Sequence, residues 1–307
     1  SNYALYGDIS ARVMHCLSQL VPNIEIYSID EAFLDLSHHQ PAEGYTQFAA
    51  QIRQQVYQHV GVTVSIGIAK SKTLAKVANH AAKQYPKTGG VVSIEQADRH
   101  KKLLKMTDCN EVWGVGRQFT RRLKQFNIHN AWQLANSPTQ WIRQQFNSVL
   151  VKTVLELNGT PCFEDASIHH ERKQIICSRS LKPAINNPDL LTQALAHFIC
   201  KALAKCRKEQ VQTNQMHIFI QGDRFSIPVF YQHRRIKLLQ ASQDSRPFLK
   251  AMRTLLPSLN PTNQPIKRVG VMLLNLHSSQ QQQLDLLLPK TEPKLCQLID
   301  HINTHCQ

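Results

Sequence analysis

Asp30 and Glu31 are the two residues of this chain best suited, by type and spacing, to do chemistry. They lie between a short predicted strand, residues 24–27, and an alternating apolar run, residues 32–36, so a turn between strands would expose both carboxylates. Hard divalent cations such as Mg²⁺ prefer carboxylate oxygens as ligands. The pattern therefore predicts a metal-binding turn, and a hairpin turn that is acidic for no chemical reason is the alternative.

The rest of the chain is strongly basic. Its 307 residues include 36 Lys and Arg against 21 Asp and Glu, for a formal net charge of +15 at pH 7. Such an excess suits a phosphate backbone, so we expect nucleic acid as the partner and a metal ion held against a polyanion.

No apolar run approaches the roughly 20 residues of a membrane-spanning helix, and no signal peptide is visible. The eight cysteines are scattered without a CxxC pair, and we expect reduced thiols in a cytoplasmic protein.

Alternating helix and strand patterns predict that the first hundred residues form an α/β layer. Helical patterns cover residues 8–20, 45–59 and 71–83, and strand patterns cover residues 24–27, 32–36, 62–69 and 90–94. We expect these elements to build on one mixed sheet. The acidic turn joins the first two strands.

A helical unit and a mixed unit follow. Short helical patterns occupy residues 117–125, 131–135, 139–146 and 149–157, and residues 161–172 have the low periodicity of a linker. In residues 173–277 the patterns have the order βαββαβ, with strands at 173–180, 213–221, 225–231 with 234–239, and 267–276, and helices at 188–209 and 244–255. That order describes an open-faced sheet with two helices on one side. Residues 278–307 begin with a glutamine tract and predict a flexible tail.

The helix predicted over residues 71–83 carries lysines that could meet phosphate. The lysines on or next to it are Lys70, Lys72, Lys76 and Lys83, and Lys83 is at its end. If that end faces the acidic turn, its ammonium groups could hold substrate phosphates that the metals also touch. A solvated lysine face is the alternative.

The Val-Trp-Gly-Val-Gly segment at residues 112–116 resembles a helix-hairpin-helix. Gly114 and Gly116 let the backbone approach a ligand closely, and the N–H groups of the next helix point outward at its start. A phosphate there would be bound without base specificity. The next helix adds the charges of Arg117, Arg121 and Arg122. An ordinary turn between two helices is the alternative.

Two further groups of residues suggest macromolecular partners. A basic sheet face for a duplex backbone could be formed by Lys173, Arg179, Lys182, Arg234, Arg235 and Lys237, and scattered surface charge is the alternative. A short peptide for an apolar pocket of a partner could be formed by Gln283, Leu284, Asp285, Leu286 and Leu287, and a frayed amphipathic end is the alternative.

Together the ordered motifs resemble those of the Y-family translesion DNA polymerases. The resemblance rests on Tyr-Ser-Ile-Asp-Glu-Ala-Phe-Leu-Asp at residues 27–35, Gly-Ile-Ala-Lys-Ser-Lys-Thr-Leu-Ala-Lys at residues 67–76 and Trp-Gly-Val-Gly at residues 113–116. It extends to residues 1–3, 78–83 and 175–180 and covers nearly the whole chain.

The resemblance implies an α+β multidomain protein for error-prone translesion synthesis in the SOS DNA-damage response. Its parts would be a partial palm (residues 1–106), a helical thumb (107–160), a linker (161–172), a little finger that grips DNA (173–277) and the tail. Asp30 and Glu31 would hold Mg²⁺ for two-metal nucleotidyl transfer, and Lys83 would contact the incoming triphosphate. The implied partners are primer-template DNA, a dNTP and the sliding clamp, the last bound by residues 283–287. The sequence leaves open whether a cleaved UmuD dimer and RecA also bind.

One departure from the family pattern concerns a further metal ligand. Family members begin with a strand that carries another metal-binding aspartate, followed by a fingers segment, and no aspartate here lies in a matching Asp-x-Asn-x-Phe-Tyr setting. We therefore expect the amino-terminal palm strand and fingers to be absent and polymerase activity of this chain alone to be negligible. The alternative is a non-catalytic protein, derived from such a polymerase, that binds DNA and the clamp.

Overall fold

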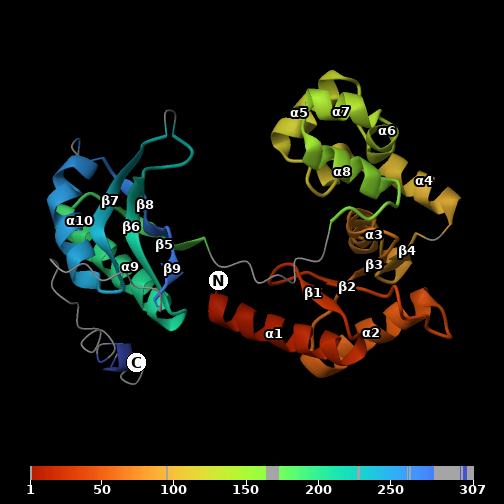
Figure 1. Cartoon of the computed structure of the whole chain (residues 1–307), viewed down its shortest axis with the longest axis horizontal. Coiled ribbons are helices and arrows are strands. Elements are labelled where there is room, and N and C mark those ends of the chain that lie inside the picture. Colours follow the sequence, from red (N-terminus) through yellow and green to blue (C-terminus); the bar gives the residue numbers. More distant parts are fainter. Residues whose placement is uncertain are drawn as a thin grey trace. The chain divides into compact units, whose positions relative to one another are not determined.

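The chain forms two compact units, Ser1–His169 and His170–Gln307, both drawn in Figure 1. The computed structural model describes residues 2–94, 96–163, 173–226, 229–260, 262, 264–279, 298 and 300–302. Among these residues, the first unit has two clusters of buried apolar side chains and the second unit has one.

Helices and short strands alternate in the first part of the first unit. They are α1 (Tyr3–Leu20), β1 (Ile24–Ile26), β2 (Ala32–Leu34), α2 (Tyr45–Val60), β3 (Ile66–Ile68), α3 (Lys72–Gln84), the 3₁₀ turn η1 (Pro86–Thr88) and β4 (Val91–Ser93). β1 pairs with β2 in antiparallel fashion, and β3 pairs with β4 in parallel fashion. The expectation of one mixed sheet is therefore wrong for the described strands, since each pair is only three residues long and forms its own sheet.

Side-chain caps determine where α1 and α3 begin. The Asn2 side chain accepts a hydrogen bond from the N–H of Leu5 at 3.3 Å, so α1 starts before the residue 8 that the pattern predicts. The Ser71 hydroxyl accepts in the same way from the N–H of Leu74 at 3.3 Å. Such caps satisfy N–H groups that a helix start leaves without a partner. The lysines of α3 consequently follow directly after a fixed helix start.

The rest of the first unit is helical. It consists of α4 (Ala97–Met106), the 3₁₀ turn η2 (Cys109–Glu111), α5 (Arg117–Gln125), α6 (Ala131–Ala135), α7 (Thr139–Gln145) and α8 (Ser148–Leu157). The patterns predict α5 to α8 closely and miss α4, which buries a single side chain, that of Leu104. Leu74 and Val77 of α3 belong to the same buried cluster as the helical core. Because the two parts share this core, the division into domains at residues 106 and 107 stays a prediction.

The second unit has the predicted strand and helix order. Its elements are β5 (Gln174–Ile185), α9 (Pro188–Lys208), β6 (Val211–Gln221), β7 (Tyr231–Ser242), α10 (Ser245–Leu259), β8 (Ile266–Leu274) and the short β9 (His277–Ser278). The sheet has the order β5-β8-β6-β7, with antiparallel neighbours. Both helices pack on one side of it, as Figure 1 shows. The other side carries no helix among the described residues.

Two strands of the second unit differ from the sequence expectation. β7 begins at Tyr231, and residues 225, 226, 229 and 230 are not in a strand, so the predicted strand at residues 225–231 is wrong for the described part. β5 runs beyond residue 180 to Ile185, with a register shift between Ser180 and Ile185. Ser278, placed by the sequence in the flexible tail, pairs with Val211 in the ladder between β9 and β6.

Gly270 lets the Phe219 ring and Ser178 approach its backbone closely on the open side of this sheet. A Cβ atom on Gly270 would lie 2.3 Å from the Cβ of Ser178 and 2.7 Å from Cζ of Phe219. Distances under about 3 Å do not occur between such atoms, so a side chain here would push Phe219 aside. The glycine therefore keeps this face flat enough for ring side chains to lie across it.

Candidate catalytic turn and nucleic-acid interface

The acidic turn, which carries Asp30 and Glu31, joins β1 to β2 as the sequence predicts. The N–H groups of Tyr27 and Ser28 donate to the Glu31 carbonyl at 3.1 and 3.0 Å and close the turn. The Ser28 hydroxyl donates to Asp30 Oδ1 at 2.6 Å and orients that carboxylate. The Asp30 side chain is exposed and Glu31 is half-buried. Both carboxylates therefore lie at one small, well-bonded turn.

α3 lies along this hairpin and pairs two of its lysines with hairpin acids. Lys76 Nζ lies 2.7 Å from Glu31 Oε2, and Lys72 Nζ lies 2.5 Å from Glu25 Oε2. Lys72 and Lys76 are thus not a solvated face, the alternative that the sequence leaves open. Glu25 is a member of the site that the sequence analysis missed.

Lys83 lies further along the same helix. It is seven residues after Lys76, or two helical turns, which corresponds to about 10 Å along the axis at 1.5 Å per residue. Its side chain is exposed, and no ion pair of Lys83 is found within the described part of the chain. A polyphosphate extending from the acidic turn along α3 could reach this ammonium group. The role of Lys83 stays a prediction.

The glycine hairpin, residues 112–116, leads directly into α5. Gly114 has a φ of +87°, in the left-handed region that favours glycine. Gly116 is the N-cap of α5, and no side chain caps that helix start. The first N–H groups of the helix are therefore open to an anion, and Arg117 and Arg121 are exposed on the same helix.

Arg122 differs from its neighbour Arg121 because it is bonded within the protein. Its Nη2 donates to the Gln145 carbonyl at 2.5 Å, and its guanidinium lies 4.9 Å from the centre of the Phe146 ring. These contacts join α5 to the end of α7. Arg122 is consequently less available to a phosphate than the sequence suggests.

Glu156 joins the helical part to the start of α3, a role that the sequence analysis missed. Its carboxylate is fully buried and accepts from the N–H of Thr73 at 2.8 Å and from that of Cys162 at 2.6 Å. Its carbonyl accepts from the Ser71 hydroxyl at 2.6 Å. A buried carboxylate with several backbone donors is satisfied rather than strained. The signal in the sequence is a single glutamate between the apolar residues Leu155 and Leu157.

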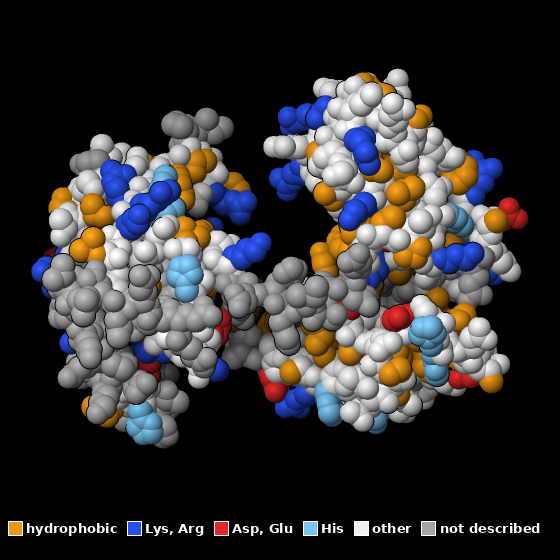
Figure 2. Space-filling model, in the orientation of Figure 1, with side chains coloured by type: hydrophobic (Ala, Val, Ile, Leu, Met, Phe, Trp, Pro, Cys, Tyr) orange, Lys and Arg blue, Asp and Glu red, His pale blue; other side chains and the backbone are white. Residues whose placement is uncertain are grey.

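The open sheet face of the second unit is the set of side chains on β6, β7 and β8 that point away from α9 and α10. Strand alternation and register assign to it His217, Phe219, Tyr231, His233, Arg235, Lys237 and Arg268. Arg235 Nε donates to His217 Nε2 at 3.0 Å, and the Arg268 guanidinium lies 5.9 Å from the centre of the Phe219 ring. Burial, with Arg235 and His233 nearby, lowers the pKa of His217. Figure 2 shows that Lys and Arg side chains outnumber Asp and Glu side chains on the visible surface of each unit.

Not all predicted basic residues of this unit share that face. Arg179 pairs in register with the buried Val269, so it lies on the side of the sheet that the helices cover, although its side chain is exposed. Arg234 donates through Nε to the Ser258 hydroxyl of α10 at 3.0 Å. Lys173 precedes β5 and is exposed. The basic face that the sequence predicts from β5 and β7 is thus formed mainly by β6, β7 and β8.

Comparisons with known proteins decide the family. The chain is 37% identical over 310 residues to Protein UmuC of Salmonella typhimurium, covering 99% of this chain and 74% of that protein. It is 35% identical to Protein MucB of Escherichia coli, over 93% of this chain and 68% of that protein. The impB/mucB/samB family model matches residues 1–80, and the C-terminal domain model of that family matches residues 172–286. This chain belongs to the Y-family (impB/mucB/samB) DNA polymerases. Within the family it is UmuC-like, and so belongs with the translesion and SOS mutagenesis proteins.

A solved structure has the same fold. A Y-family DNA polymerase chimera of Dbh and Dpo4 superimposes with a TM-score of 0.65 at 21% identity, covering 91% of this chain and 78% of the chimera. The mixed α+β fold of the Y-family polymerases is therefore confirmed. A more distant relative, DNA polymerase IV 2 of Halalkalibacterium halodurans, is 27% identical over 91% of this chain and 68% of that protein.

The donor set of the acidic turn fits Mg²⁺. Mg²⁺ is commonly held by one or two carboxylates together with waters and substrate phosphates, and this member of the family has two carboxylates on the acidic turn. Among the described residues, no group of three or more His, Cys, Asp and Glu side chains could hold a metal ion. The metal role of Asp30 and Glu31 stays a prediction.

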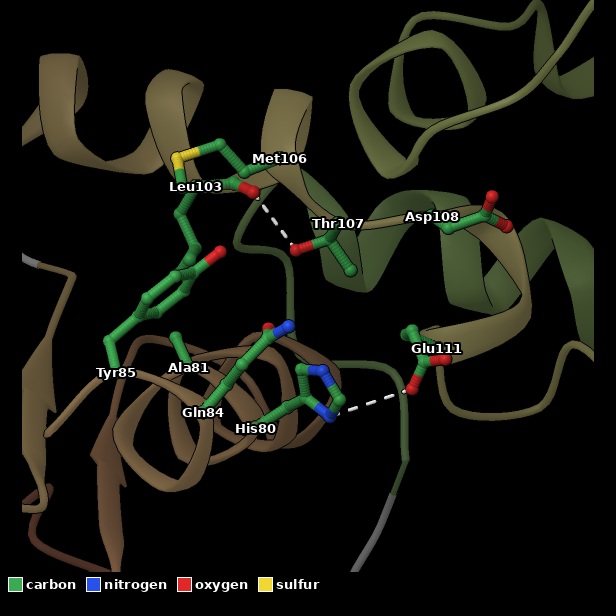
Figure 3. A pocket seen from close by; sticks show the side chains of 9 residues that line it. All are labelled: His80, Ala81, Gln84, Tyr85, Leu103, Met106, Thr107, Asp108 and Glu111. Atoms are coloured by element: carbon green, nitrogen blue, oxygen red, sulfur yellow. Dashed lines mark hydrogen bonds and ion pairs between the residues drawn. The ribbon is translucent and has the colours of Figure 1, made fainter.

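A cavity of about 260 Å³ lies between α3, α4 and η2 (Figure 3). Its walls include His80, whose Nδ1 lies 3.5 Å from Glu111 Oε2, together with Thr107 and Asp108. Asp30, Glu31 and Lys83 do not line it. The cavity is therefore separate from the acidic turn and from Lys83.

Other predictions concern the thiols, the tail and the membrane. Burial raises the pKa of the Cys109 and Cys206 thiols to about 12, so neither is a thiolate nucleophile at neutral pH. The peptide at residues 283–287 lies outside the described residues. In the part of the chain that is described, no helix has the length and apolar character needed to cross a membrane. A cytoplasmic location stays a prediction.

Proposed function

We propose that this chain contributes the metal-binding turn, the triphosphate contact and the DNA-binding surfaces of an error-prone translesion DNA polymerase of the SOS response. The observation that carries the proposal is the pair of carboxylates at the β1–β2 turn, lying against the lysines of α3 in a member of this family. In this role Asp30 and Glu31 hold Mg²⁺, which supplies Lewis-acid stabilisation of charge on the reacting phosphate.

The residues of the chain itself have three tasks around that ion. Ser28 holds Asp30 in one orientation through its hydroxyl hydrogen bond of 2.6 Å. Lys76 neutralises part of the Glu31 charge while leaving Oε1 free of that ion pair. Lys83, about 10 Å further along α3, receives the distal phosphates of the dNTP. The positive charge of Lys83 at that distance from the turn favours a triphosphate that extends along α3.

DNA is held by the glycine hairpin and by the open sheet face. At the hairpin, the N–H groups at the start of α5 bind a backbone phosphate, with Arg117 and Arg121 beside them. On the sheet, Arg235, Lys237 and Arg268 neutralise further phosphates. Such contacts read no bases, as a polymerase that must accept any sequence requires.

The sliding clamp is the proposed protein partner. In this proposal Gln283 hydrogen-bonds at the rim of a pocket on the clamp and Leu284, Leu286 and Leu287 bury their side chains in it. Full burial of one leucine contributes roughly 1.5–3 kcal/mol. Replacing Leu286 and Leu287 together with alanine should abolish capture by purified bacterial clamp and leave duplex affinity unchanged. Capture that survives the double substitution would assign the contact to another part of the chain.

Primer extension tests the catalytic proposal. The chain is assayed with Mg²⁺ or Mn²⁺, alone and fused to the amino-terminal segment that the family resemblance calls for. We expect negligible extension alone, extension by the fusion, and a loss of at least about 100-fold in Glu31→Gln, since a metal ligand contributes several kcal/mol to the transition state. Glu25→Gln is the matched control, because Glu25 lies on the same hairpin and pairs with Lys72 instead.

Two outcomes would change the conclusion. Extension that is unaffected by Glu31→Gln contradicts the metal role of the turn. No extension by the fusion, together with intact duplex binding, favours the non-catalytic DNA- and clamp-binding alternative. The ion pair that already engages Glu31 is the observation that keeps this alternative in view.

A further inference from the structure

Trp113, the residue before Gly114, lies against the hairpin that carries the acidic turn. Its Nε1–H donates to the Tyr27 hydroxyl at 3.0 Å, and the two rings meet edge to face with centres 5.3 Å apart. The Trp113 ring also lies 5.8 Å from Phe33 and 5.1 Å from Phe163, centre to centre. The glycine hairpin is therefore attached through one side chain to the turn that carries Asp30 and Glu31.

Lys76 connects this ring cluster to Glu31. Its Nζ lies 4.8 Å from the centre of the Tyr27 ring and 5.6 Å from that of Trp113, while it pairs with Glu31 Oε2 at 2.7 Å. A cation within about 6 Å of a ring centre is attracted by the ring face. One ammonium group is thus shared between the proposed metal ligand and the side chain next to the proposed phosphate site.

We propose that Lys76 and Trp113 couple duplex binding at the glycine hairpin to metal binding at Glu31, each event favouring the other. The proposal rests on the proposed function, because it uses both of its sites. Lys76 and Trp113 are positioning residues in it, and neither touches the substrate.

The coupling is positive because the metal ion and Lys76 compete for the Glu31 carboxylate. A metal ion at Glu31 weakens the ion pair between that carboxylate and Lys76. The Lys76 ammonium group is then stabilised mainly by the ring faces of Tyr27 and Trp113. A duplex on the glycine hairpin orders the backbone on either side of Gly114 and keeps the Trp113 ring in place. The duplex thereby lowers the cost of releasing Glu31 to the metal. By reciprocity, the metal must raise duplex affinity by the same factor.

Lys72 and Glu25 provide an internal control. Lys72 lies one turn before Lys76 on α3, pairs with an acid of the same hairpin and lies 5.6 Å from the centre of the Phe33 ring. Glu25 lies on β1, away from the turn that carries Glu31. Losing the lysine charge at residue 72 therefore matches the charge change at residue 76 without breaking the connection.

The test measures Mn²⁺ and duplex binding in the same protein, with no need for catalysis. Trp132 and Trp141 are replaced by phenylalanine, so that Trp113 is the remaining tryptophan of the three in the chain. Quenching of its fluorescence by Mn²⁺ is titrated with and without a duplex, and anisotropy of a labelled duplex is titrated with and without Mn²⁺. Glu31→Gln provides the baseline for Mn²⁺ that binds the DNA itself.

We expect the duplex to raise Mn²⁺ affinity about fivefold or more above the Glu31→Gln baseline, and Mn²⁺ to raise duplex affinity by the same factor. Lys76→Met should remove this factor, and Lys72→Met should keep it. Trp113→Phe, read by duplex anisotropy, should reduce it, since the bond to Tyr27 is lost while a ring is kept.

The remaining outcomes overturn distinct claims. Mn²⁺ and duplex that both bind, but within twofold of independently, overturn the coupling alone. Coupling that survives in both Lys76→Met and Trp113→Phe overturns the connection assigned to these side chains. Mn²⁺ binding that is indifferent to Glu31→Gln overturns the metal role of the turn, and the coupling with it.

Discussion

The glycine hairpin and the open sheet face would hold DNA through different groups. The hairpin offers backbone N–H groups at the start of α5, whose directions are fixed by the helix. The sheet offers the long side chains of Arg235, Lys237 and Arg268. Fixed donors lose no rotamer freedom on binding, whereas each ordered side chain costs about 0.5–1.5 kcal/mol. The hairpin should therefore contribute to duplex affinity through the fixed direction of its N–H groups, and the sheet through the positive charge of its side chains.

The largest expected effect comes from filling the anion site of the hairpin. In Gly116→Asp the new carboxylate should accept from the N–H groups of α5 in place of a phosphate. Gly116 has a φ of −81° and open space where a Cβ would lie, so the variant should fold and gain a few tenths of a kcal/mol. Losing a charge-assisted hydrogen bond of roughly 1.5–3 kcal/mol should lower duplex affinity at least about tenfold.

The measurement for this variant combines thermal unfolding with duplex anisotropy. Gln125→Glu is the matched control, because it changes the net charge equally at the last residue of the same helix. A control that loses as much affinity as Gly116→Asp would show that net charge alone decides binding at this helix.

A smaller effect is expected on the sheet, in the dependence on salt. Each phosphate contact to duplex DNA contributes roughly −0.9 to the slope of log K against log salt. Replacing Arg235 and Lys237 with alanine should therefore make that slope shallower by about 1.8. Arg234→Ala, on the same strand, should leave the slope unchanged and lower the free energy of unfolding by about 1 kcal/mol through loss of its bond to Ser258. Equal slopes for all these proteins would remove the sheet from the DNA-binding surface.

Neighbouring arginines on α5 should show the smallest effect. Arg121→Ala should make the salt slope shallower by about 0.9, the value for one phosphate. Arg122→Ala should leave it unchanged and instead destabilise the fold by roughly 1–2 kcal/mol, because Arg122 bonds to Gln145 and lies on Phe146. The two variants are compared by salt titration and by chemical unfolding, and a reversed result would exchange the roles of the two residues.

Local patterns predict the local parts of this site. The acidic turn follows from two carboxylates between strand patterns, and α5 and α6 have the predicted bounds because their apolar spacing and flanking residues agree. α4 escapes prediction because Leu104 is its one buried side chain and no side-chain cap marks its start. The single mixed sheet is wrong because three-residue strands carry too little pattern to define which of them pair.

The contacts that join the parts are invisible to such patterns. Lys76 and Glu31 are 45 residues apart, Trp113 and Tyr27 are 86 apart, and Glu156 and Thr73 are 83 apart. The sequence shows lysines on a helix, a tryptophan before a glycine and a glutamate between leucines. The position of α3 beside the hairpin and in the helical core brings Lys76 to Glu31 and Thr73 to Glu156.

Direct measurement of metal binding at the turn tests the central claim, that Asp30 and Glu31 hold the divalent ion. Free Mn²⁺ is followed by electron paramagnetic resonance during titration of the wild-type chain with a duplex, and of Asp30→Asn, Glu31→Gln and Glu25→Gln under the same conditions. The account predicts that Asp30→Asn and Glu31→Gln each weaken Mn²⁺ binding by about tenfold or more, because each removes a charged ligand. It predicts a change of less than about twofold for Glu25→Gln, whose carboxylate pairs with Lys72. Wild-type Mn²⁺ affinity in both Asp30→Asn and Glu31→Gln would contradict it.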